Sequence, residues 1–132
     1  MEAGAGEKQE GKGRIGIANL ERRKYPRFSI DLPIEYQTLN SSSTRTGRAL
    51  NASEGGLLVY LPEKMKIGQQ LALKLFFHYG AHMNVVEIIG EVVWIDLHLE
   101  KDWGDYRTGL KFVDISPDHL QRLKDFLYTL TQ

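Results

Sequence analysis

Four basic side chains lie close together in the segment 21–28, whose sequence is ERRKYPRF. Arg23 and Arg27 are separated by three residues, and Arg22 directly precedes them. The guanidinium group is planar, stays charged and offers paired donors to phosphate oxygens or to O6 and N7 of guanine. The segment therefore has the chemistry of a phosphate-binding or nucleotide-binding site, and equally that of a solvated basic linker.

The proline in this segment limits its backbone. Pro26 disfavours a helix, and it pushes Tyr25 toward extended or polyproline geometry. Arg23 and Arg27 are therefore not expected to share a helical face. We expect an extended or turned clamp instead, fixed at its C-terminal end by a strand that begins at Phe28.

A second polar cluster is the segment 51–56, with the sequence NASEGG. Asn51 and Ser53 supply hydrogen-bond donors and acceptors, and Gly56 would let a ligand approach the backbone closely. The same residue types also describe an ordinary turn. Trp94 and Trp103 offer faces for stacking, although tryptophan in a strand is more typical of a core.

Catalytic and metal-binding patterns are missing from the sequence. The four histidines (His78, His82, His98 and His119) show no ligand spacing, and the chain has no cysteine. Ser53 does not lie in a G-x-S-x-G elbow, and no G-x-G-x-x-G phosphate loop occurs. We therefore expect neither an enzyme nor a protein with a metal or cofactor.

The charge and hydropathy of the chain argue against further classes of protein. The chain has 132 residues with 17 basic and 17 acidic side chains, so no overall basic field favours nucleic-acid binding. Residues 1–29, however, contain seven basic and four acidic side chains. No apolar run is long enough to insert into a membrane, and the N-terminus has no apolar signal-peptide core. These features favour a cytoplasmic location.

Alternating apolar residues predict six strands. They lie at 28–36, from 45 onward, and at 57–61, 70–77, 85–97 and 106–115. Pro33 suggests a sheet edge or bulge, and Gly90 suggests a bulge within the fifth strand. Ser116 and Pro117 are typical of a helix start, and apolar residues then recur at helical spacing to Leu130.

The short connections between these strands require antiparallel pairing. We therefore expect an all-β dominated fold: a six-stranded antiparallel β-barrel with a C-terminal α-helix packed on it. Residues 1–20 are rich in Gly, Glu and Lys and are expected to form a flexible N-terminal arm. Residues 21–132 are expected to form one domain.

The two clusters together resemble the motifs of the PilZ domain, a bacterial receptor module for cyclic di-GMP. RKYPR matches its R-x-x-x-R motif with Arg23 and Arg27, and NASEGG matches its [D/N]-x-S-x-x-G motif with Asn51, Ser53 and Gly56. The segments GEVVWID and RTGLKFVDIS are similar to the last two strands of the family. The resemblance covers residues 21–130 and implies a split-barrel fold.

The resemblance also implies roles for the site residues. Arg23 and Arg27 would hold phosphates and guanine faces of cyclic di-GMP, and Arg22 would extend the clamp. Asn51 and Ser53 would bind a guanine edge, and Gly56 would permit close approach. Trp94 is an additional contact candidate. The resemblance implies a receptor that orders its arginine arm on binding and signals to an unidentified downstream protein.

Two other classes remain open from the sequence. One is a PilZ-like adaptor that binds proteins without a nucleotide ligand. The other is a barrel that binds single-stranded nucleic acid, although that reading predicts basic and aromatic residues spread over a strand face. Here the basic residues are concentrated in the arm, which favours the cyclic dinucleotide.

Overall fold

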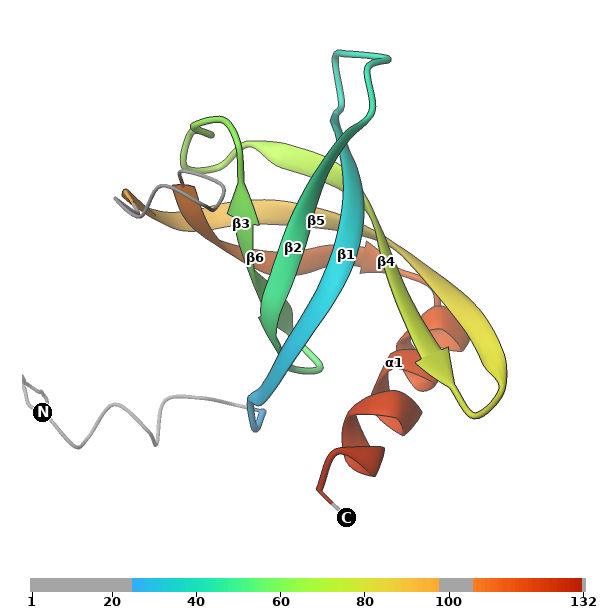
Figure 1. The fold of residues 1–132 in the computed structure, drawn as a ribbon. Helices are drawn as coiled ribbons and strands as arrows, with labels where there is room; N and C mark the ends of the chain where they lie inside the picture. Colours follow the sequence, from blue (N-terminus) through green and yellow to red (C-terminus); the bar gives the residue numbers. More distant parts are fainter. Residues whose placement is uncertain (1–24, 98–105, 132) are drawn as a thin grey trace, which may run out of the picture.

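The computed structural model describes residues 25–97 and 106–131. Within these residues six strands precede one helix (Figure 1): β1 Phe28–Thr38, β2 Arg45–Ala52, β3 Gly56–Leu61, β4 Gln70–Tyr79, β5 His82–Leu97, β6 Tyr106–Ile115 and α1 Pro117–Thr129. The predicted arm at residues 1–20 lies outside the described residues, as do Arg22 and Arg23.

The strands close into a barrel in the order β1-β2-β3-β6-β5-β4, and all neighbouring strands are antiparallel. The predicted six-stranded antiparallel barrel with a C-terminal helix is therefore confirmed. Closure removes the free edges that an open sheet would expose. It also makes β3 and β5 the two neighbours of β6, so that residues distant in sequence share one continuous surface.

Apolar side chains at every second position of the strands fill the interior of the barrel, because successive side chains point to opposite faces of a strand. In β4, for example, Leu71, Leu73, Leu75 and Phe77 are each at most 2 % exposed. The residues between them point outward. The same alternation in the other strands places one set of side chains in the core and leaves the other set on the outer surface of the barrel.

The positions of the strand bulges agree only in part with those predicted from the sequence. A register shift lies between Ile89 and Gly90 in the pairing with β6, as predicted for Gly90. Pro33 itself pairs with Arg48, and the irregularity in β1 precedes it, between Ser29 and Leu32. The predicted bulge is thus a few residues away from the proline.

Two turns are shorter than the sequence suggested. Residues 78–84 were expected to form one long turn, but β4 continues to Tyr79 and β5 begins at His82. Gly80 has a φ of +64°, a left-handed conformation that lets two residues reverse the chain. Similarly, Asn51 and Gly56 belong to β2 and β3, so only residues 53–55 form the loop between those strands.

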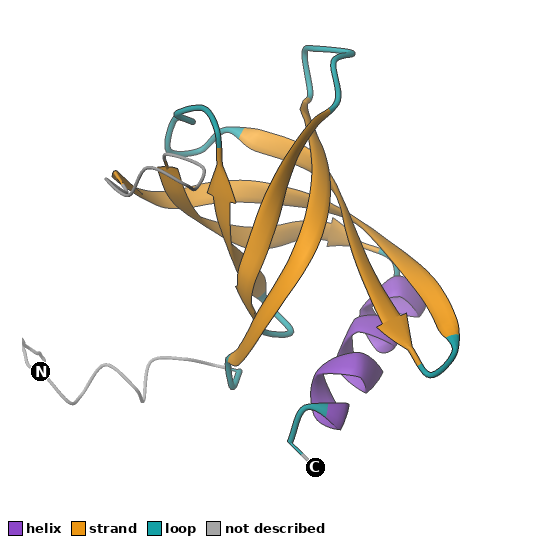
Figure 2. Cartoon of the chain, in the orientation of Figure 1, coloured by secondary structure: helices purple, strands orange, loops and turns teal. Residues whose placement is uncertain are grey.

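Helix α1 lies beside the β4–β5 hairpin, at the end of the barrel where β1 begins (Figure 2). The Ser116 side chain accepts a hydrogen bond from the His119 N–H, which confirms the predicted cap. Leu123 and Leu127 are buried, and the rings of Phe126 and Phe77 have centroids 4.4 Å apart. Leu130, expected on the apolar stripe, is 44 % exposed because it forms the C-cap.

Among the described residues, α1 is too short and too polar to cross a bilayer. Its surface carries an ion pair at 2.9 Å between Arg122 and Asp118, which are four residues apart and so lie on the same side of the helix. The helix therefore packs against the barrel through one apolar face and presents charged side chains on the other.

Candidate functional site

Arg27 in the first polar cluster contacts Asn51 in the second. The start of β1 pairs with the end of β2, so that Phe28 lies opposite Ala52 and Ser29 lies opposite Asn51. Because Arg27 directly precedes this pair, its Nη1 reaches Asn51 and donates a long hydrogen bond of 3.4 Å to Oδ1. The register of two strands thus brings together side chains from the two sequence motifs.

Ser53 organises the loop between β2 and β3. Its Oγ accepts a hydrogen bond from the Gly55 N–H at 3.1 Å, and its own N–H donates to the Gly56 carbonyl at 3.0 Å. The Gly55 carbonyl in turn accepts from the Phe112 N–H of β6 at 2.9 Å. A hydroxyl is a donor as well as an acceptor, so Ser53 can hold the loop and still donate to a ligand.

Gly56 has a packing role that the motif alone did not indicate. A Cβ at this position would lie 2.2 Å from the Leu110 carbonyl oxygen, so only glycine lets β3 approach β6 this closely. A Cβ at Gly55 would instead meet the ring of Tyr25, at 3.0 Å from Cδ2. Tyr25, a position that the R-x-x-x-R motif leaves free, therefore packs over the second motif.

Trp94 lies on the same transverse row of the barrel as Asn51. Asn51 is opposite Leu58, Leu58 is opposite Gly109, and Gly109 is opposite Trp94. Directly opposite residues share one face of a sheet, and neighbouring strands are about 4.8 Å apart, so the row spans about 14 Å. Trp94 is 38 % exposed and is a surface aromatic rather than part of the core.

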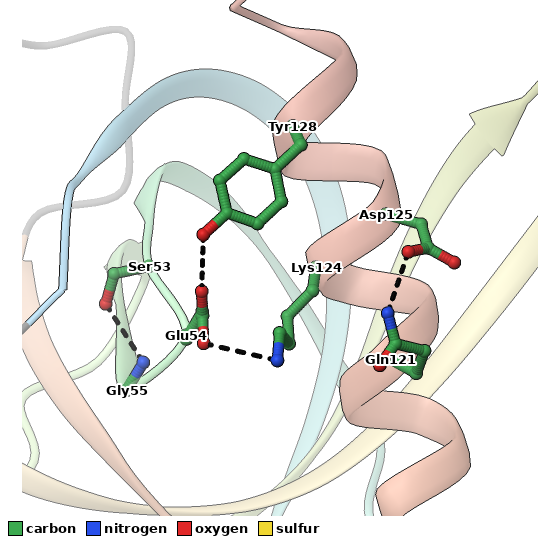
Figure 3. A network of polar contacts seen from close by, with 7 residues as sticks. All are labelled: Ser53, Glu54, Gly55, Gln121, Lys124, Asp125 and Tyr128. Atoms are coloured by element: carbon green, nitrogen blue, oxygen red, sulfur yellow. Dashed lines mark hydrogen bonds and ion pairs between the residues drawn. The ribbon is translucent and has the colours of Figure 1, made fainter.

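Glu54 connects the second motif to α1 (Figure 3). Its carboxylate accepts a hydrogen bond from the Tyr128 hydroxyl at 2.8 Å and lies 3.7 Å from the Lys124 ammonium. Figure 3 shows Glu54 pointing toward the helix and Ser53 lying on the other side of the loop. The acidic side chain within the motif is therefore directed toward the helix, where Lys124 compensates its charge.

Arg22, Arg23 and Trp103 lie outside the described residues. Sequence reasoning also missed Tyr25 and Glu54, since both occupy positions without a motif requirement. The proline after Tyr25 was the one available signal, because it favours the extended backbone from which the ring can fold over a neighbouring strand.

A separate cavity lies at the side of the barrel next to the start of α1. Its volume is about 390 Å³, and it is lined by residues of β1, β4 and β5, by the end of β6 and by the start of α1, including Glu35, Lys74 and His119. His119 Nδ1 accepts a hydrogen bond from the Glu87 N–H at 2.9 Å, which is a structural role. None of the candidate residues lines this cavity, and no metal-binding group of three ligands occurs within the described part of the chain.

These features define a small antiparallel barrel on whose outer surface Arg27 meets Asn51 of the second motif. The chain belongs to the PilZ domain family, whose profile matches residues 21–129. PilZ domains are ligand-binding receptor modules rather than enzymes. A comparison with curated proteins found no match.

Solved structures share the fold at low sequence identity. The inhibitor of motility MotI (DgrA) from Bacillus subtilis matches with a TM-score of 0.70 and 21 % identity over 82 % of this chain, which spans half of that protein's length. The PilZ domain of YcgR from Escherichia coli, solved with cyclic di-GMP, has a TM-score of 0.64 and 18 % identity, with 83 % and 92 % of the two chains covered. The PilZ domain of CeSA from a cellulose-synthesizing bacterium has a TM-score of 0.54 and 14 % identity, with 81 % and 99 % covered.

Proposed function

We propose that the protein is a cytoplasmic receptor that binds cyclic di-GMP on the outer face of the barrel and signals to a downstream protein. The observation that carries this proposal is the hydrogen bond between Arg27 and Asn51, which joins the two family motifs. The proposed ligand-binding residues are Arg22, Arg23, Arg27, Asn51, Ser53, Gly56 and Trp94.

The chemistry of the described residues suits a guanine nucleotide. Arg27 supplies a charged fork for a phosphate or for the O6 and N7 acceptors of guanine. Asn51 and Ser53 supply the amide and hydroxyl groups that bind a base edge. The Glu54 carboxylate, which would repel phosphates, is 16 % exposed and directed toward Lys124. The surface around Arg27, Asn51 and Ser53 therefore has a charge that favours an anionic ligand.

The proposed signalling depends on contacts between the arginines and the ligand that form only in the ligand-bound conformation. Bonds from Arg22, Arg23 and Arg27 to the ligand would form only when the N-terminal segment lies against the barrel. The ligand then shifts the population toward that state, because it binds that state more tightly. The downstream protein would recognise the surface created by the ordered arginines and ligand. No step of this mechanism requires catalysis or a cofactor.

Calorimetric titration with cyclic di-GMP tests the proposal. A charge-assisted hydrogen bond contributes about 1.5–3 kcal/mol, so Arg23→Ala and Arg27→Ala should each weaken binding at least about tenfold. Arg122→Ala is the matched control, because it removes the same charge from α1, where Arg122 pairs with Asp118. The site assignment is wrong if both arginine variants bind as tightly as the wild type.

The same titration separates the alternative functions. A folded wild type that binds no cyclic di-GMP favours the adaptor function. Binding to a random single-stranded oligonucleotide at moderate salt, stronger than binding to the dinucleotide, favours the nucleic-acid function. Spectra of isotope-labelled protein recorded during the titration report whether residues of the N-terminal segment become ordered, which is the event that the signalling proposal requires.

A further inference from the structure

The indole of Trp94 lies against the backbone of β6. Trp94 and Gly109 are directly opposite in the β5–β6 pair. A Cβ at position 109 would lie 2.3 Å from the indole Nε1 and 2.7 Å from Cδ1, so the five-membered ring occupies the space that a side chain would fill. An aromatic ring that covers a cross-strand glycine in this way protects the strand backbone. Gly109 therefore sets how close Trp94 can lie to the sheet.

Arg107 restrains the same ring from a second side. Its Cζ lies 5.9 Å from the centroid of the Trp94 ring, within the range of a cation–π contact. Arg107 is in turn held by Asp96, its cross-strand partner, through a 2.5 Å bond between Nη2 and Oδ2. Its Nε–H is buried and donates no hydrogen bond among the described residues, and the guanidinium is held at Nη2 by Asp96, beside the indole.

These contacts leave part of the indole open to solvent. Trp94 is 38 % exposed even though Gly109 and Arg107 both contact it, and it shares the outer row with Asn51. A ring that is already fixed loses little conformational entropy when a base stacks on it. Stacking of a base on an aromatic side chain is sequence-tolerant, whereas the hydrogen bonds at Asn51 select the base edge.

We propose that Gly109 and Arg107 are positioning residues that hold the Trp94 indole flat on the barrel as a stacking platform for a purine base of the ligand. The inference rests on the proposed function, because it assigns a subsite within the same ligand surface. Arg107 acts here through Trp94, since its guanidinium is engaged by Asp96 and by the ring. A purely structural indole would protect Gly109 without contributing to affinity.

The first measurement needs no ligand. In a Trp103→Phe background, Trp94 is the only source of an indole Nε1–H resonance, because the chain has two tryptophans. We expect Arg107→Ala and Gly109→Ala to shift this resonance and to increase solvent quenching of the fluorescence. Arg48→Ala is the matched control: Arg48 is 40 % exposed and pairs with Asp31, as Arg107 is 39 % exposed and pairs with Asp96. It should leave the resonance in place.

The second measurement is the affinity for cyclic di-GMP. Trp94→Ala should weaken binding about tenfold, and Trp94→Phe should weaken it less. Arg107→Lys keeps the charge but loses the planar group that packs on the ring. It should therefore weaken binding about as much as Arg107→Ala if Arg107 positions the indole. Arg107→Lys binding as tightly as the wild type would show attraction of the phosphates instead, and would overturn the positioning role.

The outcomes distinguish this inference from the proposed function. An unchanged Trp94 resonance in both Arg107→Ala and Gly109→Ala overturns the positioning role, whatever the ligand affinity. Wild-type affinity in Trp94→Ala overturns the stacking platform while the arginine site stands. A wild type that binds no cyclic di-GMP overturns both proposals. Because Arg107 lies on the surface, its variants keep the inference testable even where Gly109→Ala folds poorly.

Discussion

The Tyr128 hydroxyl donates a 2.8 Å hydrogen bond to Glu54 and so joins the last turn of α1 to the loop of the NASEGG motif. The bond raises the pKa of the Tyr128 hydroxyl above its ordinary value. The same end of α1 also contacts the start of β1, since the rings of Tyr128 and Phe28 have centroids 6.0 Å apart at nearly a right angle. The start of β1 and the loop between β2 and β3 are therefore both connected to one helix.

We expect removal of this connection to loosen the end of the helix. Glu54→Ala and Tyr128→Phe should each speed amide hydrogen exchange in the last turn of α1. The double variant should exchange no faster than Glu54→Ala alone, because Glu54→Ala already removes the bond to Tyr128. Tyr79→Phe, an exposed tyrosine at the end of β4, is the control. Additive effects of the two changes would show that the helix end does not depend on the Glu54–Tyr128 contact.

The two adjacent glycines of the motif should respond differently to alanine. Gly56→Ala brings a Cβ to within 2.2 Å of a main-chain oxygen, which cannot yield without a shift of β3 or β6. We expect a loss of about 1–3 kcal/mol in the free energy of unfolding. Gly55→Ala meets only the exposed ring of Tyr25 and should cost less. Urea unfolding of both variants measures the difference, and equal costs would contradict the close β3–β6 approach.

The sequence predicted the strands and the helix because burial on one face imposes a period of two or of 3.6. It did not predict the contacts of Gly56 with Leu110 or of Gly109 with Trp94, since those depend on β6 lying between β3 and β5. Nor did it show that Glu54 bonds to Tyr128, 74 residues later. Periodicity reports which face is buried, but the neighbour of each strand is decided by how the barrel closes.

The β4–β5 hairpin shows the same limit at a single turn. His78, Tyr79 and Met83 interrupt the apolar alternation, so the sequence pattern ended early and suggested a long loop. The backbone hydrogen bonds continue regardless, with Tyr79 paired to His82. The alternation of apolar residues did not predict the position of this turn, because the two strands of an exposed hairpin end can stay paired without an apolar face.

Stability should fall at alkaline pH through Tyr36. Burial and a 2.8 Å hydrogen bond to Glu63 raise the pKa of its hydroxyl well above the ordinary value of 10.0. The unfolded chain therefore loses this proton first, so the stabilisation is complete below pH 10 and decreases as the pH rises above it. The loss should approach about 1.4 kcal/mol per pH unit. Relative to the wild type, Tyr36→Phe should be less stable at pH 8, and the difference should narrow by pH 11.

Asn51 and Ser53 should separate ligand binding from loop stability. The Asn51 amide lies on the outer surface, and its contact with Arg27 is long, so Asn51→Ala should change the unfolding free energy by less than about 0.5 kcal/mol. Its affinity for cyclic di-GMP should nevertheless fall about tenfold, because the amide is proposed to bind a guanine edge.

Ser53→Ala should affect both quantities, because it removes the bond to the Gly55 N–H together with a donor for the ligand. We expect a loss of about 0.5–1.5 kcal/mol in stability, alongside weaker binding. Ser53→Thr keeps the hydroxyl and should recover most of both effects. Calorimetry measures the affinity of each variant for cyclic di-GMP, and urea unfolding of the same preparations measures its stability. Wild-type affinity in Asn51→Ala, with normal folding, would remove Asn51 from the site and leave Ser53 with a structural role alone.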